Sequence, residues 1–276
     1  MNLLSSASIF SFFTLISRIL GYLRDILIAI FLGASIFADA FFVAFRLPNT
    51  FRRLFAEGTF NAAFIPSYTS AKFKNKKKGK FFADEVLNLL LLILLFIITL
   101  AEIFTPYFVY LIAPGFAADE IKFDLAIEFT RITFPFLLFV CLSSFFSGIL
   151  NSHNKFAAAA AAPIILNIIL IISILVSYIQ NLNIAKQLSY GVTISGIIQL
   201  IFLFYCTYEF YKPNIKIYLK VTKKVKFFFK KLLPSIFSSG VTQINILVGT
   251  IIASFQAGAV SYLYYADRVY QINLAI

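Results

Sequence analysis

Three charged residues, Arg18, Arg24 and Asp25, interrupt a stretch that is otherwise apolar from Ile9 to Leu32 and is long enough to cross a bilayer. Arg18 lies about nine residues into this stretch, which corresponds to a depth of roughly 14 Å. A charge at that depth costs about 2.5 to 3.5 kcal/mol on insertion scales, so such residues usually face a protein interior or an aqueous cavity. We therefore expect a polar cavity inside a membrane protein.

Helical spacing gathers the polar residues of this first segment on one face. Arg18, Gly21 and Asp25 share one stripe, and Ser17, Gly21 and Arg24 define the neighbouring one. Gly21 removes a side chain at the centre of the face, where an anionic group or another helix can approach, and we predict a gate or hinge there. The alternative is an interhelical salt bridge between Asp25 and one arginine.

The second apolar segment carries a similar constellation near its end. We expect this helix to break at Pro48 and Asn49 and then to present Arg52, Arg53 and Glu57. Arginine side chains beside a broken helix offer planar donors, and free backbone groups, to a diphosphate. Alternatively, Arg52 and Arg53 simply mark the cytoplasmic end of a membrane span. Pro48 and Glu57 are the predicted gate or hinge positions.

A third pair of charges, Asp267 and Arg268, lies within the last apolar segment. Adjacent helical residues point in different directions, so each needs a partner elsewhere. We expect Arg268 to join Arg18, Arg24 and Arg52 around one chamber. Asp267 then balances charge or couples an ion, or it neutralises an arginine on the first helix.

The remaining reactive residues do not form a catalytic or metal site. His153 is the only histidine and lies in a predicted turn, and Cys141 and Cys206 lie in apolar segments without metal-ligand spacing. We therefore predict no catalytic residue, no metal and no organic cofactor, and a transporter rather than an enzyme.

Composition indicates an all-α, polytopic integral membrane bundle. Hydrophobic residues make up 61% of the 276 residues and charged residues 13%, against about 25% charged in soluble proteins. Apolar runs predict about eight transmembrane helices. They lie near residues 9–32, 38–56, 86–112, 125–150, 157–179, 187–208, 232–255 and 258–276.

The net charge of +12 comes mostly from two lysine clusters, within residues 72–80 and 212–231. They follow the second and the sixth predicted spans, so the positive-inside rule places both loops and the N-terminus in the cytoplasm. This topology explains the charge without nucleic acid, and binding to anionic lipid or a partner is the alternative.

The spans divide into a six-helix N-terminal lobe, residues 1–210, a basic cytoplasmic linker, residues 211–231, and two helices, residues 232–276, that start a C-terminal lobe. The apolar pattern continues to Ile276 without a cap or a basic flank, so we expect the chain to end inside a helix of a longer protein.

Several segments resemble the MurJ (MviN) family of lipid II flippases. They are SRILGYLRD at 17–25, ADAFFVAFRLPN at 38–49, RRLFAEG at 52–58, APGF at 113–116, GILN at 148–151 and YYADR at 264–268. The resemblance implies the first lobe, and the start of the second, of an exporter of the multidrug, oligosaccharidyl-lipid and polysaccharide superfamily. The family positions that it implies are functional are Arg18, Arg24, Asp25, Asp39, Asn49, Arg52, Ser261, Asp267 and Arg268.

The resemblance also implies an activity and a location. Lipid II, a diphosphate-linked sugar-peptide on a polyprenyl tail, moves from the cytoplasmic to the periplasmic leaflet of the bacterial inner membrane by alternating access around an arginine-lined cavity. In this prediction Ser17 and Asn49 join the arginines in binding substrate, Asp39 balances charge or couples an ion, and Ser261 is a gate. Membrane lipids and the cell-wall synthesis machinery are the other expected partners.

Other functions stay open at this point. They are export of another polyprenyl-diphosphate oligosaccharide, antiport of a drug-like cation, and a transport-inactive fragment or scaffold. Arginines outnumber acids in the candidate spans, which disfavours a cation exporter. Coupling to Na+ or H+, or to the membrane potential, is also open. The chain departs from the family at Gln271 and Asn273, where the family commonly has a glutamate and then a proline.

Overall fold

The computed structural model describes residues 3–54, 60–216 and 221–273, and within these ranges it is helical, without strands. The helices are α1 (Leu3–Leu32), α2 (Ile36–Leu54), α3 (Phe60–Lys74), α4 (Lys76–Ile103), α5 (Thr105–Ile112), the 3-10 helix η2 (Pro114–Ala118), α6 (Glu120–Thr133), α7 (Phe136–Ser152), α8 (Phe156–Ile179), α9 (Ile184–Thr207), α10 (Lys223–Ala253) and α11 (Ala259–Asn273). The predicted all-α class is confirmed.

Four described segments are long and apolar enough to span a bilayer: Lys76–Ile103, Glu120–Ser152, Phe156–Ile179 and Ile184–Thr207. They correspond to four of the eight predicted spans. Large apolar side chains such as Phe96, Ile172 and Ile201 lie exposed on these helices, as lipid-facing side chains do. The chain is a multi-pass membrane protein.

The lysine-rich segment 72–80 was expected to be a loop, and this was wrong. Here α3 runs to Lys74 and α4 begins at Lys76, with Asn75 alone between them. Lysine is a good helix former, and the Asn75 side chain caps α4 by accepting a hydrogen bond from the Lys77 amide at 2.8 Å. Gly79 lets the two helices approach, since a Cβ there would lie 2.8 Å from the Lys72 Cα.

The seventh predicted helix needs a similar correction at its start, because α10 begins at Lys223 rather than near residue 232. Val225, Phe228 and Leu232 recur at helical spacing and are buried, so packing extends the helix through the lysines. The division of the chain into two lobes and a linker stays a prediction.

Proline effects were partly mispredicted. The expected break at Pro48 and Asn49 is wrong, because α2 continues through both to Leu54. Pro48 has no N–H to bond the Ala44 carbonyl, and Thr133 of α6 supplies the missing donor at 3.0 Å. Pro135, in contrast, separates α6 from α7.

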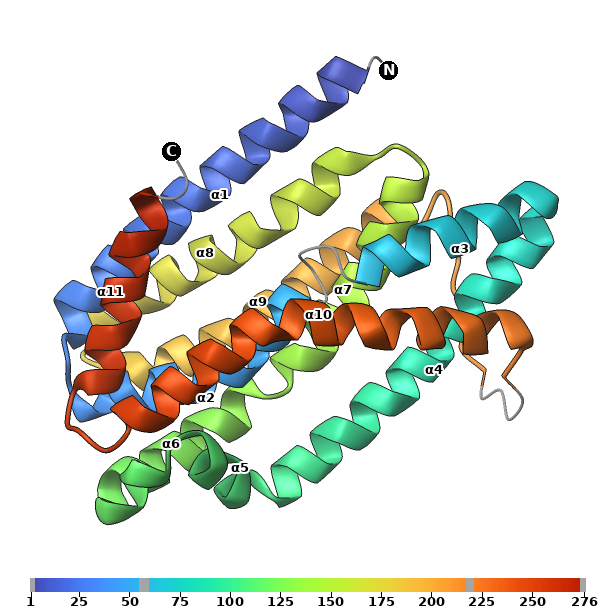
Figure 1. Cartoon of the computed structure of the whole chain (residues 1–276). Coiled ribbons are helices and arrows are strands. Elements are labelled where there is room, and N and C mark those ends of the chain that lie inside the picture. The colour runs from blue at the N-terminus through green and yellow to red at the C-terminus, as the bar shows by residue number, and fades with distance from the viewer. Residues whose placement is uncertain (1–2, 55–59, 217–220, 274–276) are drawn as a thin grey trace.

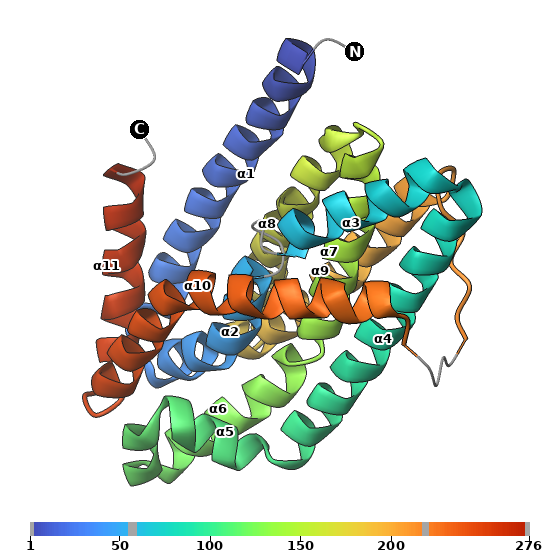
Figure 2. The same ribbon diagram turned by 45° about the vertical axis from the view of Figure 1, so that its right-hand side comes forward.

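Figures 1 and 2 show α7 and α9 inside the bundle, α1 along α8, and α10 crossing α2 and α3 before the chain turns into α11. The turns that follow odd-numbered predicted spans meet at one end. The Gly115 amide donates to Ser254 Oγ at 3.0 Å, and Tyr265 donates to the Gly33 carbonyl at 2.8 Å. The even-numbered turns meet at the other end, where Lys72 lies 2.7 Å from His153.

Candidate functional site

A buried carboxylate joins the first helix to the last described one. Asp25 of α1 accepts hydrogen bonds at Oδ1 from Arg24 Nε (2.9 Å) and Arg24 Nη2 (2.6 Å), while Arg268 Nε of α11 lies 3.2 Å from Asp25 Oδ2. Arg24 and Asp25 are each 7% exposed. One negative charge thus faces two positive ones, so the group carries a net positive charge in a buried place. The interhelical salt bridge that the sequence left as an alternative is present.

Asn167 of α8 orients Arg24 from the other side. Its Oδ1 accepts from Arg24 Nη1 at 2.8 Å, and its Nδ2 donates to the Ser17 carbonyl oxygen at 2.9 Å. The Asn167 side chain therefore links Arg24 to the backbone of Ser17, about two turns earlier on α1. Gly21 lies between these contacts, and a Cβ there would meet Asn167 Nδ2 at an ordinary 3.5 Å.

Tyr264 positions Arg268. The tyrosine hydroxyl donates to Asp25 Oδ1 at 3.0 Å and accepts from Arg268 Nη2 at 3.2 Å, and the Arg268 guanidinium lies 4.7 Å from the tyrosine ring centroid. The Tyr264 ring stacks on Phe42 of α2 with centroids 4.0 Å apart. Gln271 Oε1 accepts from Arg268 Nη1 at 3.0 Å, one helical turn further on. Helix α11 is thereby fixed against both α1 and α2.

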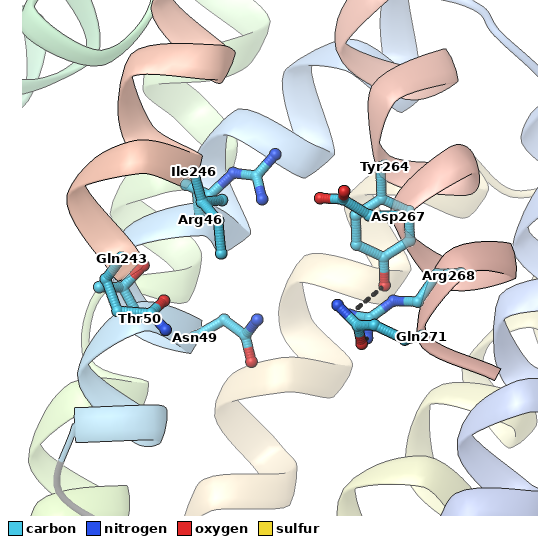
Figure 3. Close-up of a pocket in the computed structure, with 9 residues that line it drawn as sticks. All are labelled: Arg46, Asn49, Thr50, Gln243, Ile246, Tyr264, Asp267, Arg268 and Gln271. Carbon is cyan, nitrogen blue, oxygen red and sulfur yellow. Dashed lines mark hydrogen bonds between the residues drawn. The ribbon is translucent and has the colours of Figure 1, made fainter. Parts of the chain in front are cut away.

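A small pocket adjoins this cluster between α2, α10 and α11 (Figure 3). Arg46 and Asn49 project from α2 on one side, and Asp267 and Arg268 project from α11 on the other. The lining residues are Arg46, Asn49, Thr50, Gln243, Ile246, Tyr264, Asp267, Arg268 and Gln271. Its interior volume of about 20 Å³ has room for about one water molecule, so the site is closed in this conformation.

A second polar cluster closes the end of the bundle where the odd-numbered turns meet. Asp39, at the start of α2, is fully buried and accepts from Lys122 Nζ (2.6 Å), the Gly258 amide (2.9 Å), the Ser261 amide (2.9 Å) and Ser261 Oγ (2.6 Å). The carboxylate therefore caps the N-terminus of α11 from another helix, which also favours its charge. Lys122 lies 4.1 Å from the Phe116 ring centroid. Opening this end requires these bonds to break.

The predicted site residues fall into distinct groups. Arg24, Asp25, Arg268 and Ser17 meet in the first cluster, while Asn49 and Asp267 line the adjoining pocket with Arg268. Arg52 Nε donates to Asn49 Oδ1 at 3.0 Å. Asp39 and Ser261 pair with each other.

The structure does not place three of the predicted site residues in these clusters. Arg18 is exposed on α1 and is not among the residues that line the pocket. Glu57 lies outside the described residues, and Pro48 lies within a continuous helix rather than at a break. The hinge or gate roles of Gly21 and Pro48 stay predictions.

Sequence reasoning missed several partners of these clusters, among them Tyr264, Asn167 and Lys122. Asn167 and Ser173 are the two polar residues in the apolar run from Pro163 to Val176, and Asn167 carries the one amide side chain there. An isolated polar residue at membrane depth is itself a signal of function. Lys122 was passed over as part of an external turn, yet it is 5% exposed and neutralises Asp39. Nothing in its local sequence marks it as buried.

The chain is similar to known proteins in both sequence and fold. Residues 28–276 match the family model described as "Lipid II flippase MurJ". The chain is 41% identical over 278 residues to a probable lipid II flippase MurJ of Rickettsia prowazekii (strain Madrid E), covering 100% of this chain and 54% of that protein. It is 33% identical over 281 residues to the probable lipid II flippase MurJ of Aquifex aeolicus (strain VF5), with the same coverage.

Among solved structures, "Lipid II flippase MurJ, inward closed conformation" is similar with a TM-score of 0.82 and 31% identity, covering 95% of this chain and 54% of that one. An outward-facing multidrug resistance transporter of the MATE family and MOP superfamily shares the fold, with a TM-score of 0.69, 16% identity, and coverage of 96% and 59%. The chain spans about half the length of the curated relatives it matches.

Proposed function

The chain belongs to the MurJ family of lipid II flippases, and we propose that it forms the part of such a transporter that holds the substrate diphosphate. Lipid II moves from the cytoplasmic to the periplasmic leaflet of the bacterial inner membrane, with the N-terminus of the chain in the cytoplasm. The observation that carries this proposal is that Arg24 and Arg268, from two helices, share the buried carboxylate of Asp25, while Arg46 of a third helix lines the adjoining pocket with Arg268.

Arginine suits this task because its guanidinium stays protonated and binds two phosphate oxygens at once. Asp25 occupies Arg24 and Arg268 in the closed conformation. Arg268 Nε lies at ion-pair distance from Asp25 but has no hydrogen-bond acceptor among the described residues. A substrate phosphate that enters when the pocket opens would offer that acceptor, so Arg268 then exchanges Asp25 for phosphate.

The cluster around Asp39 supplies the second part of an alternating-access cycle. While Asp39 holds Lys122 and the N-terminus of α11, the end of the bundle where the odd-numbered turns meet stays closed. We assign that end to the periplasmic side, in agreement with lysine-rich turns at the other end. Release of lipid II to the periplasm then requires α11 to leave Asp39.

The membrane potential supplies a way to reset the cycle. An empty cavity with net positive charge is drawn toward the negative cytoplasmic side by about 2.3 kcal/mol per charge per 100 mV. Transport that is unaffected by collapse of the potential would contradict this step, and replacing Na+ or changing pH at constant potential tests ion coupling separately.

Complementation tests the function. A bacterium depleted of its own lipid II flippase should grow when it expresses the full-length protein that contains this chain, and Arg24→Ala should abolish that growth. Arg131→Ala is the matched control, because Arg131 is an exposed arginine on α6. Failure of the wild type to rescue growth, with normal membrane insertion, would contradict the proposal.

A further inference from the structure

The lysine-rich ends of α4 and α10 flank a second cavity, of about 450 Å³, which is open to the surface. Figures 1 and 2 show the N-terminal ends of these two helices beside one another, although they are far apart in the sequence. The cavity is lined by Lys77, Lys78, Phe81, Phe82, Glu85, Thr222, Lys223 and Lys224. It shares no residue with the pocket between α2, α10 and α11.

Positive charge is in excess at this cavity because four lysines line it with one acid, Glu85, and both Glu85 and the neighbouring Asp84 are hydrogen-bonded to other groups. Glu85, which is 2% exposed, accepts from the amide of Thr222 and from Thr222 Oγ1 at 2.7 Å. Asp84, which is 4% exposed, accepts from Tyr211 Oη at 2.6 Å and from the Asn214 amide at 3.1 Å. Both carboxylates therefore fix the segment between α9 and α10 rather than the lysines.

The four lysines, Lys77, Lys78, Lys223 and Lys224, are all exposed and none has a described carboxylate within 4.0 Å. Four positively charged side chains thus surround one opening, and each can form an ion pair with an anionic ligand. The first turns of two helices add partial positive charge in the same place. This local field favours a group that carries more than one oxygen with negative charge, such as a phosphate.

The apolar walls of the cavity favour a phosphate that is attached to a lipid over a soluble phosphate. Phe81 and Phe82 form an apolar wall, and α4 continues from them as a membrane-spanning helix with exposed apolar side chains at Leu92 and Phe96. These two residues lie roughly 16 and 22 Å along the helix from Phe81, which is comparable to the roughly 15 Å of one hydrocarbon leaflet. A soluble anion makes no apolar contact with this surface, whereas the acyl chain of a lipid packs against it.

We propose that this cavity binds the phosphate headgroup of an anionic phospholipid, whose acyl chains lie along the exposed face of α4. The bound lipid joins α10, and through it α11, to the end of α4. The inference rests on the membrane location of the chain and not on the identity of the transported substrate, so it stands or falls separately from the proposed function.

The test compares two sets of four substitutions in the purified full-length protein. Lys77, Lys78, Lys223 and Lys224 are changed to Gln in one variant, and Lys74, Lys80, Lys216 and Lys230, exposed lysines outside the cavity, in the matched control. Short-chain phosphatidylglycerol, short-chain phosphatidylcholine and inorganic phosphate are the probes. Bound lipid is counted by native mass spectrometry, and unfolding temperature is recorded with each probe.

We expect phosphatidylglycerol to bind the wild type and the control alike and the cavity variant at least about tenfold more weakly, because each lysine near an anionic headgroup contributes roughly a fivefold factor. Equal loss in both variants would show diffuse charge attraction and overturn the proposal. So would unchanged binding to the cavity variant, equal binding of phosphatidylcholine, or equal stabilisation by inorganic phosphate. If the cavity variant does not fold, Lys223→Gln with Lys224→Gln replaces it, against Lys216→Gln with Lys230→Gln.

Discussion

Asp25 of α1 and Arg268 of α11 face each other at 3.2 Å, and Arg24 holds the other oxygen of the same carboxylate. This contact links the first described helix to the last one. Two guanidinium groups share this carboxylate, and the adjoining pocket adds Arg46 and Asp267, so the site as a whole keeps one excess positive charge. We regard that excess of positive charge as the property on which anion binding depends.

Replacing Asp25 should be more damaging than replacing an exposed acid. Asp25→Ala leaves Arg24 buried without a counter-charge and removes the ion pair of Arg268, and loss of one partner of a buried ion pair typically costs about 3 to 5 kcal/mol. We expect a clear fall in the thermal unfolding temperature of the purified protein in detergent. Asp124→Ala, at an exposed position on α6, is the control and should change it little. Equal stability of the two variants would show that the cluster does not hold α1 against α11.

The Asp39 cluster should govern access to the end of the bundle where the odd-numbered turns meet. Ala38 is fully buried there, so a cysteine at position 38 reports opening when the native Cys141 and Cys206 are replaced by Ala. Asp39→Asn leaves Lys122 without its counter-charge and should raise the labelling rate about tenfold or more.

The control for this experiment is Glu128→Gln, which removes the exposed Lys186–Glu128 ion pair. Exposed pairs contribute about 0 to 1 kcal/mol, so labelling at position 38 should stay near the wild-type rate. Equal rates in the Asp39→Asn and Glu128→Gln variants would mean that Asp39 is not part of the closure.

We expect Asn167 to affect transport because it positions Arg24. Asn167→Leu removes both the acceptor of Arg24 and the donor to Ser17, and a buried arginine donor without a partner costs about 1 to 3 kcal/mol. We expect growth rescue in the depleted bacterium to be lost with Leu and retained in part with Asp, which keeps the acceptor. Full rescue by Asn167→Leu would exclude a role for this amide in positioning Arg24.

Thr133 and Pro48 form a pair that a double-mutant cycle resolves. Thr133→Val removes the donor to the Ala44 carbonyl and should lower unfolding stability by about 1 to 2 kcal/mol. In the Pro48→Ala background the backbone regains its own N–H donor, so the same substitution should cost measurably less. Equal costs in both backgrounds would mean that Thr133 does not compensate for the proline.

Stability should fall at acidic pH because of His153, the only histidine in the sequence. Burial, with Lys72 2.7 Å away, lowers the pKa of His153 in the folded protein from its ordinary value near 6.5. The unfolded chain then binds more protons as the pH drops below about 6.5, so the unfolding temperature should fall from pH 7 toward pH 5. His153→Gln should remove that part of the pH dependence, and an unchanged profile would contradict the assignment.

Sequence patterns predicted the class of the fold, and they indicated that Arg24 and Asp25 have buried polar partners, because both depend on local physics. A charge such as Arg24 inside an apolar helix needs a buried polar partner, and that requirement holds before any partner is known. Helical spacing also placed Ser17 and Arg24 on one face, where Asn167 now joins them.

The sequence could not predict which contacts are made across helices. Whether Pro48 breaks α2 depends on Thr133, which is distant in the chain. Whether Lys122 is exposed or buried depends on Asp39, and whether residues 223–231 are linker or helix depends on the burial of Val225 and Phe228. Propensity alone leaves both outcomes open.

Lipid II movement in proteoliposomes tests the central claim most directly. The full-length protein is reconstituted with lipid II in one leaflet, and its appearance in the other is followed over time. We predict transport by the wild type and by Arg131→Lys. Transport by Arg24→Lys and by Arg268→Lys should be at least about tenfold slower, because lysine keeps the charge but cannot form the bidentate hydrogen bonds of arginine with phosphate. Transport at the wild-type rate by both lysine variants, or its absence in the wild type, would contradict the account.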